Sequence, residues 1–250
     1  MDALNKFSIK RLWLLIKRNA VLNQKTWLLG FAASAGVLIL ISLFITYRWG
    51  GNLNLEALVV IGHFLIFIEG FLLTSKVFHE LQTPARSQYF LTLPAKTSEK
   101  VVANWLLSSI IYIVAAYIGL FLVLVASSLL NAAIFGSQIE IYNLLTIEQI
   151  ELIGHYLVLQ TIFFLGSVYF RKNNFLNTVL SVIVIGKILS IWTWFLAWML
   201  LVPYFPATTN FQIDTWINLE SETLFSIIYW GLIAPFFLIV SYFTLKEREI

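Results

Sequence analysis

Residues 101–127 read VVANWLLSSIIYIVAAYIGLFLVLVAS, a run without a single charged side chain. A membrane-crossing helix needs about 20 mainly apolar residues, because each helical residue advances only about 1.5 Å through a hydrocarbon core about 30 Å thick. The run is therefore long enough to span a bilayer. It is also about twice the length of a transmembrane barrel strand and lacks the alternation of one. We expect an all-α integral membrane protein.

The rest of the chain has the same character. Hydrophobic residues make up 60% of the 250 positions, charged residues make up 12%, and the mean hydropathy is +0.86. A soluble domain carries about 25% charged residues, and it could not hide this much apolar surface from water. Residues 1–250 are therefore expected to form a single transmembrane domain. The six expected spans are Trp27–Tyr47, Ala57–Ser75, Val101–Ser127, Glu151–Tyr169, Val179–Val202 and Leu224–Leu245.

Composition also excludes several kinds of site. The chain has no cysteine, so it forms neither disulfides nor thiolate metal sites. The net charge of +3 is small, and its distribution follows the expected spans rather than a nucleic-acid-binding face. We expect no nucleic-acid partner.

Lys and Arg residues lie in alternate connections between the expected spans. All but two of the 16 fall in the first 26 residues, in 76–100, in 171–172 and in 246–248. Of the other two, Arg48 lies in a connection on the opposite side and Lys187 lies inside a span. Short cytosolic loops of membrane proteins carry the excess of Lys and Arg. This pattern predicts that both termini are cytosolic and that the loops 48–56, 128–150 and 203–223 are outside.

The first 25 residues are amphipathic on a helical wheel, with apolar residues on about half of the circle and cations opposite. The residues of this expected interfacial helix include Lys6, Lys10, Arg11, Trp13, Lys17 and Arg18. Such a helix lies in the plane of the membrane interface, with its cations near anionic lipid headgroups. Two interpretations stay open: an elbow helix that leads into the first span, and an anchor that only keeps the N-terminus inside.

A basic patch with a proline, RSQYFLTLPAKTSEK at 86–100, separates the second and third spans. One interpretation is a simple helix start, in which Thr97 or Ser98 caps the third helix and Glu99 suits its first turn. Pro94 then ends whatever precedes it.

The segment before that proline is longer than a helix start needs. A turn between spans takes only a few residues, whereas the polar and aromatic stretch HELQTPARSQYF occupies 79–90. Aromatic residues exposed to the cytosol indicate a docking surface. The residues expected to form it are Arg86, Tyr89, Phe90, Leu91 and Pro94.

An in-plane basic helix, six spans with both ends inside and a polar segment after the second span together resemble the membrane subunits of ABC exporters. Those permeases carry a segment close to LPxsxxEkvlsK between spans two and three, and residues 93–104 read LPAKTSEKVVAN. The matching residues are Leu93, Pro94, Glu99 and Lys100. Lys96 stands where the family has a small polar residue, and Asn104 stands where it has the final lysine.

The resemblance implies that this chain is a permease subunit in a bacterial cytoplasmic (inner) membrane, that residues 76–100 are a coupling segment, and that residues 80–98 dock a separate ATPase. It also implies a second permease copy or a paralogue. The chain has no G-x-x-x-x-G-K-[ST] loop, since Gly186-Lys187 is followed by Ile188. ATP and Mg²⁺ are therefore expected only in the partner ATPase, and this chain is expected to carry no cofactor and no enzymatic activity of its own.

Glu69, Lys187, His63 and His155 are ionisable residues inside the spans. Glu69 and Lys187 lie at similar estimated depths, about 10 Å and 12 Å from the cytosolic boundary at about 1.5 Å per residue. Because a lone charge inside the bilayer is costly, they are candidates for a pair, although Glu69 can also be protonated or reach the interface. His63 and His155 are expected to be hydrogen-bonded packing residues, since no metal-ligand spacing such as H-E-x-x-H is present.

Two other functions are consistent with the same spans. One is a structural or accessory subunit of a membrane complex, without transport activity. The other is an intramembrane enzyme that uses His63, His155 and Glu69, although no nucleophile or metal spacing supports it.

Overall fold

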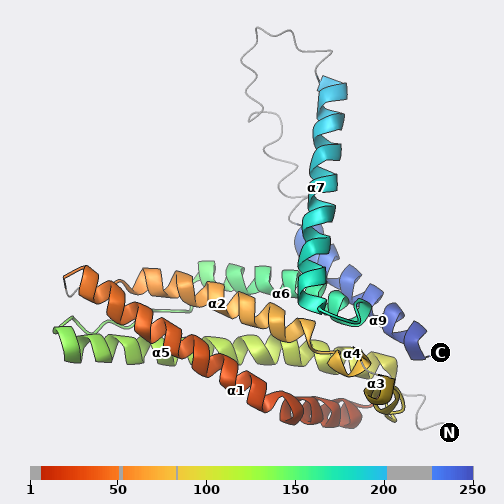
Figure 1. Ribbon diagram of the computed structural model, residues 1–250, viewed down its shortest axis with the longest axis horizontal. Helices are drawn as coiled ribbons and strands as arrows, with labels where there is room; N and C mark the ends of the chain where they lie inside the picture. Colours follow the sequence, from red (N-terminus) through yellow and green to blue (C-terminus); the bar gives the residue numbers. More distant parts are fainter. Residues whose placement is uncertain (1–6, 51–52, 83, 202–226, 250) are drawn as a thin grey trace.

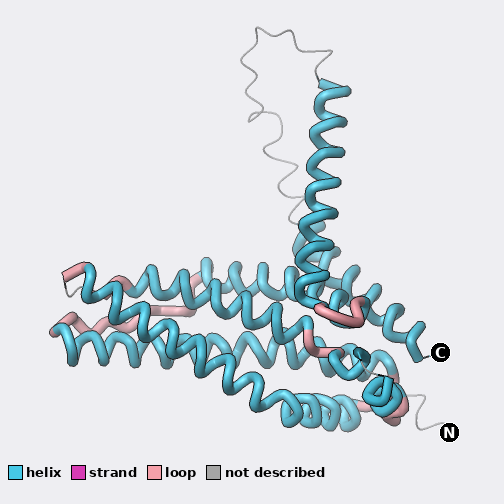
Figure 2. The backbone as a smooth tube through the Cα atoms, in the orientation of Figure 1, coloured by secondary structure: helices cyan, strands magenta, loops and turns pink. Residues whose placement is uncertain are grey.

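The computed structural model describes residues 7–50, 53–82, 84–201 and 227–249, and every regular element in these ranges is a helix (Figure 1). The long helices are α1 (Ile9–Arg48), α2 (Leu55–Ser75), α5 (Tyr112–Phe135), α6 (Ile147–Tyr169), α7 (Asn174–Leu201) and α9 (Ala234–Glu249). The short ones are η2 (His79–Gln82), α3 (Pro84–Leu91), α4 (Thr97–Leu106) and the π-helical turns η3 (Leu107–Ile111) and η6 (Tyr229–Ile233). Figure 2 shows that the loops lie mainly at helix ends, apart from the α5–α6 connection, which runs back along the helices.

In the described part of the chain, six helical segments are long and apolar enough to cross a membrane, which agrees with the predicted number of spans. These segments are Ile9–Arg48, Leu55–Ser75, Thr97–Phe135, Ile147–Tyr169, Asn174–Leu196 and Tyr229–Arg248. Each overlaps one of the predicted windows. Lys6, the outer loop 203–223 and the beginning of the sixth predicted span lie outside the described residues.

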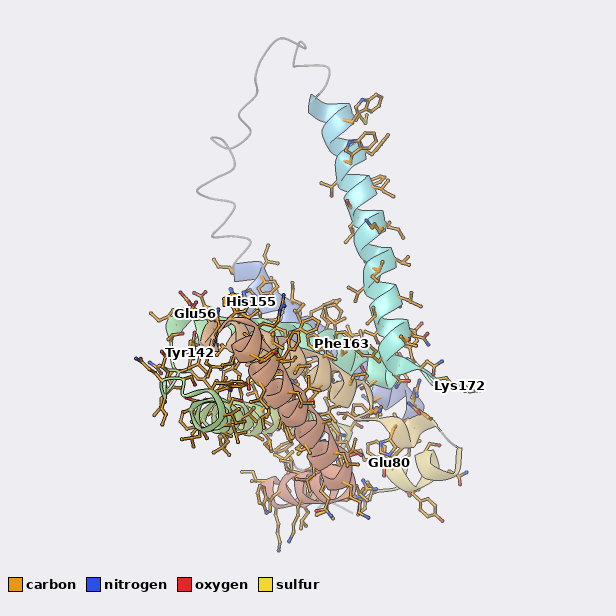
Figure 3. All side chains as sticks on the ribbon, turned by 60° about the vertical axis from the view of Figure 1, so that its left-hand side comes forward. Glu56, Glu80, Tyr142, His155, Phe163 and Lys172 are labelled. Atoms are coloured by element: carbon orange, nitrogen blue, oxygen red, sulfur yellow. The ribbon has the colours of Figure 1, made fainter. Side chains whose placement is uncertain are left out.

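The expected elbow helix is not a separate element, because α1 continues without interruption for 40 residues. At about 1.5 Å per residue, it is about twice as long as the hydrocarbon core is thick. Figures 1 and 3 show that its first part runs at an angle to the remainder. In this part the side-chain amide of Asn23 donates to the carbonyl of Asn19 at 2.8 Å, and side chains that enter the backbone ladder bend helices. The location of this part in the membrane interface stays a prediction.

Two π-helical turns occur among the described residues of the spans. η3 joins α4 to α5, so that one helical path runs from Thr97 to Phe135. η6 comes directly before α9, whose second residue is Pro235. Proline lacks the backbone N–H that an α-helical ladder requires, and a π turn is one of the local adjustments that accommodate it.

The core of the bundle lies where α2, α5 and α6 meet. Tyr112 and Tyr156 are fully buried, and each hydroxyl donates to a backbone carbonyl, at 2.8 Å to Ile66 and at 3.0 Å to Ser108. A Cβ atom at Gly70 would collide with both tyrosine rings. The close approach of the three helices therefore depends on a glycine at this position.

α7 leaves the bundle crosswise, so the expected six-span bundle is not formed by the described residues (Figures 1 and 2). Its first turns pack on α6, where Thr178 lies against Gly166. Beyond them the described side chains are mostly exposed, including those of Trp192, Trp194 and Trp198. A helix that is apolar around its whole circumference has no preferred face with which to join a bundle. Its cover must come from lipid or from another chain.

The four basic segments of the chain meet at one end of the bundle, which we call the basic end. Figure 3 shows Glu80 and Lys172 toward this end, whereas Glu56 and Tyr142 lie toward the other. Hydrogen bonds between segments hold it together: Arg18 to Glu80, Gln82 to Asn174, and Arg248 to the carbonyl of Tyr169. The grouping agrees with the charge pattern, and the assignment of the basic end to the cytosol stays a prediction.

Candidate functional site

The expected coupling segment, residues 76–100, lies at the basic end between the first part of α1 and the ends of α6 and α9. Its centre of attachment is Glu99, whose side chain is 0% exposed. Oε1 accepts a bond from the backbone N–H of Ser8 at 2.7 Å and one from Nη2 of Arg11 at 2.8 Å. Oε2 accepts from Nε of Arg11 at 3.0 Å. One residue of the coupling segment therefore fastens the beginning of α1.

Glu99 also caps its own helix. Its Oε2 accepts from the backbone N–H of Lys96 at 3.0 Å, and α4 begins at Thr97 with Lys96 as the N-cap. The expected cap by the hydroxyl of Thr97 or Ser98 is therefore wrong, because both residues lie inside the first turn. A carboxylate at the third helical position that reaches back to the N-cap amide takes over that task.

A second pair of contacts links α1 to the coupling segment. Arg18 donates from Nη2 to Oε1 of Glu80 at 2.7 Å and from Nη1 to Oε2 at 3.1 Å. Next to it, Nδ2 of the buried Asn19 donates to Oδ1 of Asn104 at 2.6 Å. The first part of α1 is therefore held by two guanidinium–carboxylate pairs and an amide pair.

Phe90 is buried, which corrects the expectation that it belongs to an exposed docking surface. Its side chain is only 3% exposed and meets the ring of Phe78 edge-on, with 5.9 Å between centroids. It shares an apolar cluster with residues of α6 and α9, among them Phe164 and Leu245. Leu91 is half-buried against the same cluster. Because α3 needs an apolar face to pack on the bundle, Phe90 and Leu91 hold this helix against the bundle and do not form an exposed docking surface.

Lys100 is also used inside the fold. Its Nζ donates to the carbonyl of Leu91 at 3.0 Å and lies 5.3 Å from the centre of the Phe90 ring. An ammonium over an aromatic face is attracted by the ring quadrupole. Glu99 and Lys100, both of which match the exporter segment, therefore hold the coupling segment in place.

The outward face of the coupling segment is formed by other residues. Tyr89 is 76% exposed, and Gln88, Thr92 and Pro94 are also exposed. The side chain of Arg86 lies outside the described residues. Of the five expected docking residues, Tyr89 and Pro94 are thus the ones whose described side chains are open to a partner.

A cavity of about 530 Å³ opens beside the coupling segment. Its walls come from α1, from the end of α2, from α4 with η3 and from the beginning of α7. The lining is mixed: it includes Lys76, Asn23 and Asn104 together with apolar residues such as Trp27 and Leu107.

Glu69 and Lys187 do not meet, so the expected pair is not formed. Glu69 faces a cavity of about 240 Å³ bounded by α1, α2 and α5, and Ser34 of α1 also lines this cavity. Lys187 is exposed on the projecting α7. Similar depth did not bring the two side chains together, because the two helices diverge.

The two histidines within the spans have different hydrogen-bond partners. Nδ1 of His63 is 2.7 Å from the carbonyl of Val59, and its Nε2 is 2.9 Å from the hydroxyl of Tyr117. Nδ1 of His155 is 2.9 Å from the hydroxyl of Tyr229. Across the described part of the chain, no group of three His, Asp or Glu residues could hold a metal ion.

Sequence reasoning missed a buried polar network at η3. Nε2 of Gln160 donates to the hydroxyl of Ser108 at 2.7 Å, and the hydroxyl of Tyr156 donates to the carbonyl of the same serine. The Ser108-Ser109 pair within an apolar run was the available signal. Polar residues within a span usually face the interior of the bundle.

Comparisons with known proteins do not assign the chain. No model of a protein family matches it, and neither a curated protein nor a solved structure does.

Proposed function

We propose that this chain is the membrane-spanning permease subunit of an ATP-driven exporter of the ABC type, powered by a separate ATPase that docks on residues 80–98. The observation that carries the proposal is the attachment of the coupling segment. α3 is anchored by the buried Phe90, and α4 is fastened to α1 through Glu99, while Tyr89 stays exposed.

Such an arrangement suits force transmission. A partner that pushes on the exposed face of α3 displaces a short helix whose inner face is packed against α6 and α9. The hydrogen bonds of Glu99 and Glu80 carry the same displacement to α1. Because packed interiors transmit strain, movement of the coupling segment reaches several spans together.

A second permease copy and membrane lipids complete the proposal. The apolar surface of α7 has no cover from the described residues beyond its first turns. In a bilayer, lipid and the facing subunit cover such a surface. The site of the complex would be a bacterial cytoplasmic membrane, with the basic end toward the ATPase.

The test is co-purification of the tagged chain with a P-loop ATPase expressed beside it, followed by an assay of ATP hydrolysis. Tyr89→Asp places a charge on the exposed face of α3 without touching the buried cluster, so we expect the ATPase to be lost or no longer stimulated. Tyr47→Asp is the matched control, since Tyr47 is 73% exposed at the opposite end of the bundle.

If the Tyr89→Asp variant still bound and stimulated the ATPase fully, the proposal that the coupling segment docks the ATPase would be refuted. Failure of the wild-type chain to recruit any P-loop ATPase from its native membrane would favour a structural or accessory subunit instead.

A further inference from the structure

The 530 Å³ cavity at the basic end has a mixed lining. Lys76, Asn104 and the backbone of the first turn of α7 supply polar groups, whereas the side chains of Leu72, Leu107 and Phe175 are apolar. Ligand sites of proteins are usually apolar hollows of about 300–1,000 Å³ with a few convergent polar groups. The size and lining of this cavity correspond to that description.

The beginning of α7 contributes backbone N–H groups to the lining of the cavity. The N–H of Asn177 bonds to the carbonyl of Asn173 at 2.9 Å, so the helix starts just after Asn173. The N–H groups of its first turn, at 174–176, have no carbonyl four residues earlier within the helix. These residues line the cavity. The exposed amides and the dipole of a long helix favour an anion at this place.

Asn104 is an independent observation that points to a ligand. Its side chain is 2% exposed, and its Oδ1 is occupied by the amide of Asn19. Its Nδ2 donates no hydrogen bond within the described residues, and it is not one of their fully buried unpartnered atoms, so it is accessible from the cavity that Asn104 lines. An acceptor in the cavity would complete the hydrogen bonding of this amide.

The charges around the cavity favour an anion. Lys76 is exposed at the rim, and the lining contains no carboxylate among the described residues. The last carbonyls of α2, which would repel an anion, are already occupied: those of Leu73 and Thr74 accept the backbone N–H groups of Lys76 and Val77. Glu80, the acidic residue nearby in the sequence, is paired with Arg18.

We propose that this cavity binds the phosphate group of an anionic amphiphile. Nζ of Lys76, Nδ2 of Asn104 and the first amides of α7 hold the phosphate, and an acyl chain packs against the apolar residues of the lining. The chemistry is that of a phosphate monoanion or diester, supplied by a phospholipid headgroup or by free phosphate. The proposal does not depend on an ATPase partner.

Binding is measured by native mass spectrometry of the purified full chain in detergent, titrated with phosphatidylglycerol in one arm and inorganic phosphate in the other. Lys76→Gln should weaken binding about tenfold, as expected for one lost charge-assisted hydrogen bond. Asn104→Asp keeps an oxygen for Asn19 and replaces the free donor by a negative charge, so it should weaken binding at least as much.

Lys25→Gln is the matched control, because Lys25 is an exposed cation of α1 outside the lining of the cavity. The affinity of the Lys25→Gln variant for phosphatidylglycerol and for phosphate should stay within about twofold of the wild type, because an exposed charge far from the ligand contributes little. Thermal unfolding and gel filtration of all three variants identify any loss of folding.

Binding of phosphatidylglycerol without competition from inorganic phosphate would identify a lipid as the source, whereas effective competition would show that the phosphate alone suffices. Absence of binding in both arms would overturn the proposal. Equal affinities of the Lys76→Gln, Asn104→Asp and Lys25→Gln variants would do the same.

Discussion

Replacing Phe90 by alanine tests whether α3 is anchored from within. Its side chain is 3% exposed, packs edge-on against Phe78 and lies beneath the ammonium of Lys100. Removal of a buried phenylalanine costs about 3–5 kcal/mol. Tyr89→Ala is the matched change one residue earlier, and because that side chain is 76% exposed, its loss should change stability by less than about 0.5 kcal/mol.

The assay is thermal unfolding in detergent, followed by tryptophan fluorescence, together with hydrogen exchange read by mass spectrometry. A change of 1 kcal/mol moves the midpoint of a chain of this size by about 2–4 °C. Phe90→Ala should therefore lower the midpoint of thermal unfolding by about 10 °C. Faster hydrogen exchange should be confined to α3 and the beginning of α4. Equal effects of the two variants on midpoint and exchange would refute the burial of Phe90 and the anchoring of α3.

Two further predictions concern the basic end. Glu99→Gln removes the charge that faces Arg11, so hydrogen exchange should become faster in the first turns of α1, and unchanged exchange there would contradict the role of Glu99. Since the chain has no cysteine, Gln138→Cys and Gln88→Cys each introduce a unique thiol. An impermeant thiol reagent should label the first in intact spheroplasts and the second only after permeabilisation, and the reverse pattern would invert the predicted topology.

The number and approximate limits of the spans could be predicted from the sequence, because membrane insertion depends on the local sum of side-chain transfer free energies. The predicted window Ala57–Ser75 lies within α2 and ends at the same residue, and Glu151–Tyr169 lies within α6 in the same way. The gathering of Arg18, Lys172 and Arg248 at one end of the bundle also follows from local charge, as their alternate placement along the chain indicates.

The direction of individual side chains could not be read in this way. Tyr89 and Phe90 are neighbours in one aromatic stretch, and both were expected to be exposed. Only the packing of α3 against α6 and α9 decides that Phe90 turns inward, because those helices are distant in sequence and supply Phe164 and Leu245. The polar network around Ser108 depends in the same way on Gln160, which comes from another helix.

The sequence by itself determined that this protein is helical, that six segments can cross a membrane and that its cations gather in four short segments. All three depend on the composition of each segment alone. Tertiary structure decided that Glu99 fastens the beginning of α1, that Glu69 and Lys187 stay apart and that α7 leaves the bundle. Each of these depends on which helix lies beside which, and therefore on shape complementarity between segments that no local pattern contains.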